Sequence, residues 1–187
     1  MSSKSGKLIV ISAPSGCGKT TIVERLLARS KNLTRSVSYT TRPPRPGEED
    51  GRDYFFISES DFLSKKRSGF FLESAEVFGH YYGTSKEFVL GCLSRGLSVV
   101  LAIDVQGMKQ LRETTAKEIS MKTIFIMPPS IELLKARLEK RKTETKEEIE
   151  RRLQIAQEEM AERSKYDFVV VNRKVEEAIK EIEVIAK

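Results

Sequence analysis

The stretch at residues 6–21, GKLIVISAPSGCGKTT, constrains the fold more than any other part of the chain. Four β-forming residues from Leu8 to Ile11 predict a buried strand, and the apolar spacing after Thr21 predicts a helix. The loop between them closely matches G-x-x-x-x-G-K-[ST], whose backbone N–H groups surround a polyphosphate at a helix N-terminus. A strand, a phosphate-binding loop and a helix in this order indicate a nucleotide-binding domain.

Each residue type in this loop has a chemical reason to be there. Gly16 and Gly18 let the backbone approach the phosphates, Lys19 brings a point charge to them, and the Thr20 hydroxyl can ligate Mg²⁺. The first glycine of the pattern is replaced by Ala13, which is tolerated if its φ angle is negative. A plain Gly/Ser turn is the alternative, but it does not explain a lysine and a threonine directly after the second glycine.

Composition narrows the class of protein. The chain has 187 residues, a net charge of +6 and two cysteines. No apolar run approaches the ~18 residues of a membrane span, and no signal peptide is recognisable, so we expect a cytoplasmic protein with no membrane partner. Cys17 and Cys92 are interpreted as free thiols. Lys and Arg are interleaved with Asp and Glu rather than massed on one stretch, so anionic small ligands explain the excess charge as well as nucleic acid does. We expect no nucleic-acid partner.

Strands and helices alternate along most of the chain. The predicted strands cover residues 8–11, 36–39, 97–104, 121–129 and 166–172. The predicted helices cover residues 20–30, 58–66, 85–95, 130–141, 145–164 and 176–186, and another helix begins after Asp104. Residues 70–85 are predicted to form one or two strands with a turn at Gly79. Capping boxes are predicted at Thr84 with Glu87 and at Thr145 with Glu148.

This order predicts an α/β protein, because three strands that are apolar throughout are typical of a parallel sheet covered by helices. Residues 36–90 break the alternation and are predicted to be an inserted lobe, and the highly charged residues 130–164 a second, mobile lobe. The core of this single domain would then consist of residues 1–35, 91–129 and 165–187.

The segment SVSYTTRPPRPGEEDGRDYFF, residues 36–56, is predicted to be a binding loop. Two prolines follow Arg42 and a Pro-Gly pair follows Arg45, so both guanidinium groups are presented on a stiffened backbone. A planar guanidinium matches phosphate with two parallel hydrogen bonds. A solvated turn is the alternative for both arginines.

Taken together, these motifs resemble the guanylate kinases, which phosphorylate GMP with ATP. The matching segments, which fall in the family's order and spacing and cover essentially the whole chain, are SAPSGCGKTT, SVSYTTRPPRPGEEDGRDYFF, YYGTS, LAIDVQG, RLEKRKTET and VVVN. The resemblance implies the three-layer fold of the P-loop kinases, with a parallel sheet core, an inserted mixed α+β lobe that binds GMP, and a helical lid.

The resemblance also implies the ligands of GMP. Those of its phosphate would be Ser38, Arg42, Arg45, Tyr54 and Tyr82. Glu73 would accept hydrogen bonds from the ring N–H and the exocyclic amine of guanine, and Thr84 and Asp104 would complete the base contacts. Glu48 is also drawn into the ring of groups around GMP, although it could simply solvate the loop. Such a site rejects a wrong base because its own polar groups would be left unpaired.

On the ATP side, the resemblance implies contacts from the phosphate loop and from one distant residue. The residues of the loop are Ala13, Pro14, Ser15, Gly16, Cys17, Gly18, Lys19, Thr20 and Thr21. The distant residue is Asn172, which would contact adenine. Mg²⁺ would be held by Thr20, and by Asp104 through water. The groups expected to neutralise charge during transfer are Lys19, Arg42 and the lid residues Arg137, Arg141 and Arg152.

Simpler interpretations stay open for several of these residues. Tyr54 and Tyr82 could be packing residues, and Glu73 could be a surface acid. Thr84 and Asp104 could each cap a helix, the lid arginines could lie on a charged surface, and Asn172 could end a strand. Two residues depart from the family pattern: Lys142 replaces a glycine, and Ala102 stands where many relatives have an acid.

The expected reaction is in-line transfer of the γ-phosphoryl group of ATP to GMP, giving GDP and ADP, a step of GMP recycling in purine metabolism. No general base is needed, because a phosphate monoester with a second pKa of about 6 is largely ionised at neutral pH. Two alternatives remain: a related scaffold domain that has lost catalysis, and a P-loop kinase with another acceptor. Oligomeric state and the use of dGMP cannot be inferred from the sequence.

Overall fold

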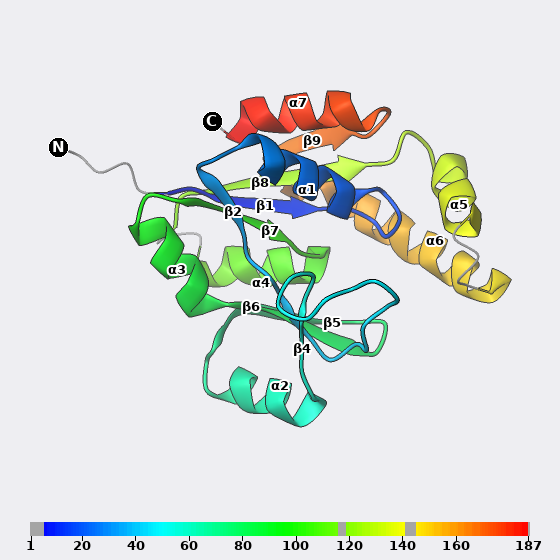
Figure 1. The fold of residues 1–187 in the computed structure, drawn as a ribbon. Helices are drawn as coiled ribbons and strands as arrows, with labels where there is room; N and C mark the ends of the chain where they lie inside the picture. Colours follow the sequence, from blue (N-terminus) through cyan, green and yellow to red (C-terminus); the bar gives the residue numbers. More distant parts are fainter. Residues whose placement is uncertain (1–5, 116–118, 141–144, 187) are drawn as a thin grey trace. The chain divides into compact units, whose positions relative to one another are not determined.

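The computed structural model of the chain describes residues 6–115, 119–140 and 145–186. Its main sheet has the strand order β2-β7-β1-β8-β9, and the pairs β2–β7 and β8–β9 are parallel (Figure 1). These strands are β1 (Leu8–Ser12), β2 (Leu33–Arg35), β7 (Ser98–Ala102), β8 (Met121–Met127) and β9 (Phe168–Val171). The predicted α/β class with a parallel sheet is therefore confirmed.

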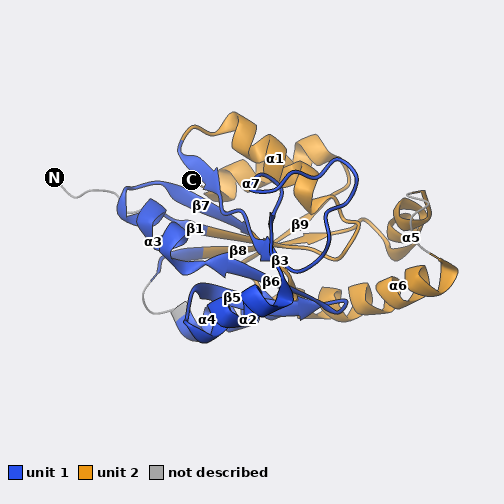
Figure 2. Cartoon of the chain, turned by 60° about the horizontal axis from the view of Figure 1, so that its bottom comes forward, with its two compact units in different colours: residues 1–8, 32–101, 106–121 blue, residues 9–31, 102–105, 122–187 orange. Residues whose placement is uncertain are grey.

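The chain forms two compact units, which are coloured separately in Figure 2. Unit 1 lies within residues 1–8, 32–101 and 106–121, and unit 2 within residues 9–31, 102–105 and 122–187. The predicted division into a core, a GMP-binding lobe and a lid uses different boundaries and stays a prediction.

Unit 1 contains a second, four-stranded sheet of order β4-β3-β6-β5. β3 pairs with β4 in parallel and with β6 in antiparallel orientation, and β5 and β6 form an antiparallel hairpin. The strands are β3 (Tyr39–Thr40), β4 (Phe55–Phe56), β5 (Phe71–Val77) and β6 (His80–Ser85). The helices are α2 (Glu59–Arg67), α3 (Lys86–Ser94) and α4 (Val105–Thr115), of which Val105 belongs to unit 2.

The β5–β6 hairpin turns where the sequence predicted. Phe78 and Gly79 have φ angles of 52° and 75°, and the left-handed conformation that the turn requires is one that glycine adopts without steric cost. Beneath the hairpin, the buried Phe62 of α2 stacks on Phe71 and Tyr81, with ring centroids 4.5 and 5.4 Å apart. These rings supply the local core that fixes the position of the hairpin on α2.

Two predictions for unit 1 are wrong in detail. The α3 helix is capped by Ser85, which accepts a hydrogen bond from the Phe88 N–H, whereas Thr84 lies in β6 and bonds to a side chain of β5. The strand predicted at residues 36–39 is mostly absent, because these residues connect β2 to β3 in a different sheet. Local β preference cannot show where a strand changes partner.

Unit 2 contains the helices α1 (Lys19–Arg29), α5 (Ile131–Lys140), α6 (Lys146–Ala161) and α7 (Val175–Ala186). The capping box at the start of α6 is confirmed: Thr145 accepts from the Glu148 N–H at 3.2 Å, and the Glu148 carboxylate accepts from the Thr145 N–H at 2.7 Å. This helix ends at Ala161 and continues as a 3-10 turn, Glu162–Lys165, before β9 begins.

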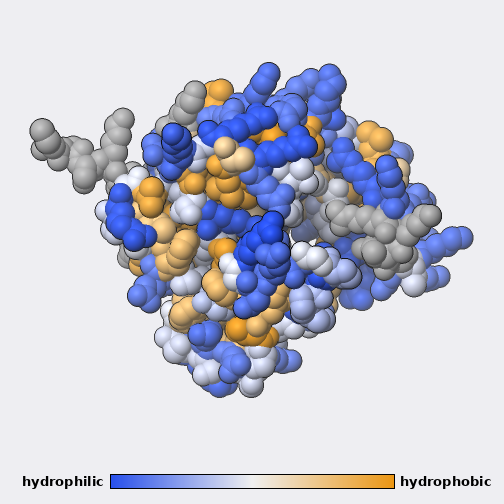
Figure 3. All heavy atoms as spheres, viewed as in Figure 1, coloured by the Kyte–Doolittle hydropathy of each residue, from blue (hydrophilic) through white to orange (hydrophobic). Residues whose placement is uncertain are grey.

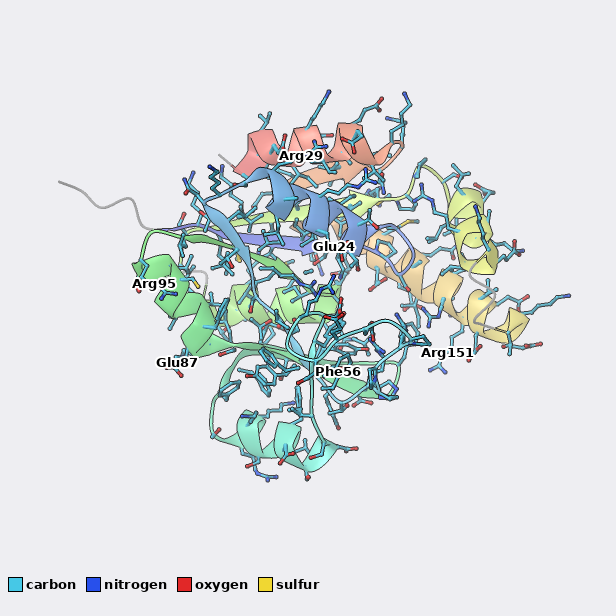
Figure 4. The ribbon with its side chains drawn as sticks, viewed as in Figure 1. Glu24, Arg29, Phe56, Glu87, Arg95 and Arg151 are labelled. Atoms are coloured by element: carbon cyan, nitrogen blue, oxygen red, sulfur yellow. The ribbon has the colours of Figure 1, made fainter. Side chains whose placement is uncertain are left out.

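Helices α1 and α7 lie side by side in unit 2 (Figure 1). Glu176 of α7 accepts from Arg25 at 2.5 Å and from Arg29, the last residue of α1, which is labelled in Figure 4. These side chains are exposed, so solvent screens each pair and it contributes little to stability. The helices are held mainly by their buried apolar side chains, which are Ile22, Val23 and Leu26 of α1 and Ala178, Ile179 and Ile182 of α7.

Hydrophilic residues cover most of the face shown in Figure 3, and hydrophobic residues form smaller separate groups. The large apolar side chains that are exposed come from several different elements: Phe78, Phe88, Leu90, Leu133, Phe168, Val169 and Val184. Within the part of the chain that the structure describes, no helix combines the length and the apolar character needed to span a bilayer.

Candidate active site

The phosphate loop of unit 2 runs from the end of β1 to the first residue of α1. Gly16 and Gly18 have φ angles of 88° and 85°, and Gly18 is the N-cap of α1. Since Phe78 is the sole non-glycine residue with a positive φ angle in the described ranges, the φ angle of Ala13 is negative. A negative φ angle is the condition under which alanine is tolerated in place of the first glycine of the pattern, so this prediction is confirmed.

Neighbouring side chains also pack closely against the two glycines. A Cβ on Gly16 would lie 3.0 and 3.1 Å from methyl groups of Leu138 and Leu134, and a Cβ on Gly18 would lie 3.0 Å from Asn172 Nδ2. Both leucines belong to α5 and are buried. A Cβ at either position would therefore require these neighbours to shift by a few tenths of an ångström, in addition to the strain of a positive φ angle.

Lys19 stands beside the end of β7. Its ammonium group donates a 2.9 Å hydrogen bond to the carbonyl of Ile103, the residue before Asp104. The Ser12 hydroxyl donates to the carbonyl of Asp104 at 3.5 Å. The structure thus brings together Lys19 and the strand end that carries the predicted acid, and Thr20 lies exposed in the first turn of α1.

This region fits a magnesium ion by the chemistry of its donors. The Thr20 hydroxyl and the Asp104 carboxylate are hard oxygen ligands, which Mg²⁺ prefers, and Mg²⁺ usually completes its shell with waters and substrate phosphates. Both residues belong to unit 2. Their roles as ligands stay predictions.

Two of the three predicted lid arginines are near the loop. Arg152 of α6 donates a 3.0 Å hydrogen bond to the hydroxyl of Ser15. Arg137 of α5 is close enough to Cys17 to act on its thiol electrostatically. Arg141 lies outside the described residues, as does Lys142.

Cys17 is a buried filler of the loop. Burial raises the pKa of its thiol to about 12, although Arg137 and Lys19 act in the opposite direction. The thiol therefore stays protonated at neutral pH, when it is a poor nucleophile.

Asn172, the residue directly after β9, supports the phosphate loop. Its Nδ2 donates a 2.8 Å hydrogen bond to the carbonyl of Cys17, while its buried Oδ1 has no hydrogen-bond partner in the structure as described. The side chain is only 1% exposed. It follows that Asn172 supports the backbone of the loop, whereas its expected contact with adenine stays a prediction.

Glu159 was not singled out by sequence reasoning. It lies on α6 seven residues after Arg152, so both side chains project from the same face of the helix, and Ala156 between them is buried. Burial raises the pKa of Glu159 to about 7; Lys19 lowers it, and Asp104 raises it further. In the sequence, the helical spacing of Arg152, Ala156 and Glu159 could have indicated that Glu159 shares a face with Arg152.

In unit 1, Arg42 is held by Glu48. One terminal nitrogen of Arg42 donates to both carboxylate oxygens of Glu48, at 2.8 and 2.9 Å, and Glu48 also accepts from the Arg45 N–H at 2.7 Å. Burial opposes the charge on Arg42, but the bonds to Glu48 outweigh it, so the pKa of Arg42 is raised. The Arg45 side chain is exposed, and the contact of Arg45 with Glu48 is made by its backbone N–H.

Two tyrosines adjoin this arginine. The guanidinium carbon of Arg42 lies 5.5 Å from the ring centroid of Tyr54 and 5.9 Å from that of Phe56, which is labelled in Figure 4. The rings of Tyr54 and Tyr82 are 6.0 Å apart. Burial raises the pKa of Tyr54, so its hydroxyl stays protonated and can donate to an anion.

Ser38 and Arg35 lie next to this cluster. The carbonyl of Ser38 accepts from the Phe55 N–H at 2.9 Å, which aligns Ser38 with the residue after Tyr54. Arg35, which sequence reasoning missed, donates to the carbonyl of Asp53 at 2.9 Å and acts electrostatically on Tyr54. Its buried Nε has no hydrogen-bond partner among the described residues. A charged residue in a short strand was the only sequence signal.

The predicted guanine reader is buried. Glu73 is 4% exposed, and its carboxylate accepts a 2.5 Å hydrogen bond from the buried hydroxyl of Thr84. The alternative of a surface acid is therefore wrong, as is the alternative that Thr84 caps α3. Unit 1 thus brings together Arg42, Glu48, Tyr54 and Tyr82 in one cluster and Glu73 with Thr84 in another, while Asp104 belongs to unit 2.

Comparisons with known proteins agree with this geometry. The family model described as guanylate kinase matches residues 5–187. A guanylate kinase of Wolbachia sp. subsp. Brugia malayi is 50% identical over 177 residues, which are 95% of this chain and 90% of the relative. One from Caldanaerobacter subterraneus subsp. tengcongensis is 49% identical over 182 residues, 97% of this chain and 87% of the relative.

A solved structure is also similar over the whole length. The crystal structure of guanylate kinase from Anaplasma phagocytophilum superimposes with a TM-score of 0.83 at 35% sequence identity, covering 100% of this chain and 87% of that protein. The fold, the phosphate loop and the matches over nearly the full length agree: this chain belongs to the guanylate kinase family.

Proposed function

We propose that the chain transfers the γ-phosphoryl group of Mg²⁺-bound ATP to GMP, giving ADP and GDP. The observation that carries this proposal is the buried Glu73 carboxylate with its Thr84 partner, in a unit that also gathers Arg42, Tyr54 and Tyr82. A carboxylate, a guanidinium and two phenols are the donors and acceptors that a guanine base and a phosphate dianion require. Membership of the guanylate kinase family supports the same reaction.

ATP would be held by unit 2. The N–H groups of the loop around Gly16 and Gly18 would surround its phosphates at the N-terminus of α1, where the helix dipole favours negative charge. The Lys19 ammonium, half-buried beside the carbonyl of Ile103, would contact the β and γ oxygens. Mg²⁺ held by Thr20, and by Asp104 through water, would neutralise charge on these phosphates when bound.

GMP would be held by unit 1. The phosphate would accept hydrogen bonds from Arg42 and from the hydroxyls of Tyr54 and Tyr82, with Ser38 and Arg45 completing the set. Arg42 already donates to Glu48 and to the carbonyl of Pro43, so its orientation is largely fixed before a ligand arrives. A ligand therefore does not bear the full entropic cost of ordering this side chain.

Guanine would be read by Glu73. One carboxylate oxygen is held by Thr84, so the carboxylate is oriented before GMP binds. Its oxygens would accept from the ring N–H and the exocyclic amine of guanine, groups that adenine does not present in this combination. A site of this kind can discriminate by up to about 10⁴–10⁵, because the wrong base leaves its buried acceptors unpaired. The expected contact of Asp104, a residue of unit 2, with the base stays a prediction.

Transfer would need no general base, because the acceptor phosphate is largely ionised at neutral pH. The contribution of the protein is then alignment and charge neutralisation by Lys19, Arg42, Arg137 and Arg152, together with Arg141 outside the described residues. One such arginine contributes ~10³ or more in rate in related reactions. The helical lid would exclude water, which would otherwise hydrolyse ATP.

A coupled assay of ADP release with GMP, dGMP, AMP and CMP tests the proposal. We expect turnover with GMP far above that with AMP or CMP, while dGMP shows whether the ribose 2′-hydroxyl is required. No turnover with any acceptor would favour the scaffold alternative, and a preference for AMP or CMP would favour another kinase.

The Lys19→Ala variant serves as the matched test of the phosphate loop. We expect it to abolish turnover while far-UV circular dichroism and the unfolding midpoint stay close to those of the parent. Lys31→Ala is the control, since Lys31 is exposed in the loop after α1. A Lys19→Ala enzyme with normal turnover would refute the assignment. The substrates expected are GMP and ATP, and the cytoplasmic location stays a prediction.

A further inference from the structure

A side chain of α4 is bound to the strand that carries Glu73. The Oε1 atom of Gln110 accepts a 2.6 Å hydrogen bond from the backbone N–H of Ser74, the residue directly after Glu73. In the sheet order β4-β3-β6-β5, β5 is an edge strand, so one row of its backbone groups has no strand partner. Gln110 therefore satisfies a backbone donor on the open edge, at the position next to the predicted guanine reader.

The same part of β5 is irregular. Phe71 pairs with Ser85, but Glu73 pairs with Thr84, so β5 carries one extra residue between these two pairs. A bulge of this kind disrupts the ladder, bends the strand and turns the side chains that follow it. It places Glu73 opposite Thr84, whose hydroxyl bonds to the carboxylate. Because the ladder is weakened here, the direction of Glu73 depends on side-chain contacts in addition to the backbone pairing of β5 with β6.

We propose that Gln110 is a positioning residue for guanine recognition: by binding the Ser74 N–H, it fixes the bulged backbone and with it the direction of the Glu73 carboxylate. This inference rests on the proposed function, in which Glu73 reads the base. Gln110 does not contact GMP in this scheme. Gln110 fixes the backbone next to Glu73, and Thr84 fixes its carboxylate.

The inference predicts a specific defect. Glu73 must present two acceptors to guanine, one to the ring N–H and one to the exocyclic amine, and a rotation of the carboxylate would weaken the second bond. IMP has the ring N–H but lacks the exocyclic amine, so it reports on that second bond. Losing Gln110 should lower kcat/KM for GMP by about threefold to tenfold, the effect of one hydrogen bond, and change IMP much less.

The experiment compares Gln110→Met and Gln110→Ala with the parent enzyme, using GMP, IMP and ATP as the varied substrates. Gln110→Met keeps the length of the side chain and removes the acceptor, so it guards against a folding defect of Gln110→Ala. Lys109→Ala is the matched control, because Lys109 is an exposed neighbour on the same helix. We expect a reduced ratio of GMP to IMP activity in both Gln110 variants, an unchanged KM for ATP, and no change in the control.

A double-mutant cycle separates this role from general support of the fold. In the Glu73→Gln background, Gln110→Met should not reduce the GMP to IMP ratio further, since the two residues act in series. Equal losses with GMP and IMP, or a raised KM for ATP, would overturn the inference and make Gln110 a purely structural residue. If Glu73→Gln itself leaves acceptor preference unchanged, both the assignment of Glu73 as the base reader and the inference about Gln110 are wrong. If it alters preference but Gln110→Met does not, only the inference fails.

Discussion

The side-chain amide of Asn172 donates a 2.8 Å hydrogen bond to the carbonyl of Cys17, which lies 155 positions earlier in the chain. This bond joins the residue after β9 to the middle of the phosphate loop. Both groups are buried, and Asn172 Nδ2 would lie 3.0 Å from a Cβ on Gly18. The conformation of the loop is therefore fixed partly by a residue outside the loop.

Replacement of Asn172 by Asp tests this support. The substitution keeps the shape but turns the Nδ2 donor into a second carboxylate oxygen, which would repel the carbonyl of Cys17. We expect KM for ATP to rise at least about tenfold with a smaller change for GMP, and stability to fall by about 1–3 kcal/mol. Asn32→Asp, at an exposed position, is the control. An unchanged KM for ATP would show that the bond does not shape the loop.

The raised pKa of Glu159 predicts a pH dependence of stability. Burial raises this pKa from 4.5 to about 7, so between these values the folded chain binds a proton that the unfolded chain has lost. The free energy of unfolding should therefore fall as pH rises from about 4.5 to 7, by at most about 3 kcal/mol from this group, and then level off.

Denaturant unfolding from pH 4.5 to 8 measures this contribution as the difference between the parent and Glu159→Gln. The difference should shift across that window in favour of the variant. Glu158→Gln, an exposed neighbour on α6, should show no such shift. A difference that is independent of pH would mean that Glu159 is ionised throughout the range in the folded protein.

Motifs that act over short distances were readable from the sequence. The phosphate loop, the hairpin turn at Gly79 and the Thr145–Glu148 capping box depend on local backbone conformation, and the structure has all three. The strand predicted at residues 36–39 failed because its preference is local, whereas the change of sheet at this point is set by distant partners.

The supporting contacts of the site were harder to predict for the same reason. Arg35 reaches the backbone of Asp53, Gln110 that of Ser74, and Asn172 that of Cys17, and each pair is far apart in the sequence. A hydrogen bond from a side chain to a backbone group outside its own local motif leaves no pattern in the sequence, because any residue can supply the backbone partner. Only the fold shows such pairs, while a residue such as Lys19 is revealed by its own motif.

Thr84→Val tests the support of the buried carboxylate. Valine keeps the β-branched shape of threonine but removes the hydroxyl that donates to Glu73 at 2.5 Å. A buried carboxylate that loses a donor costs about 1–3 kcal/mol or more, so we expect lower stability and a higher KM for GMP, with KM for ATP unchanged. Thr34→Val, in strand β2, is the control. Parent-like GMP kinetics would remove Thr84 from the base site.

Glu48→Gln tests whether the contact with Arg42 arranges the phosphate site or competes with it. The two side chains are only 10% and 19% exposed, so the pair is partly desolvated, and Glu48 also binds the backbone N–H of Arg45. Glutamine offers a single acceptor and no charge, so Arg42 loses its fixed orientation. We expect KM for GMP to rise about threefold to tenfold, measured by the coupled assay at constant ionic strength.

Glu49→Gln, whose parent side chain is exposed and pairs with Arg52, should leave KM unchanged. A lower KM for GMP in Glu48→Gln would mean that the carboxylate competes with the substrate phosphate for Arg42, because removing its charge would then free the guanidinium for GMP.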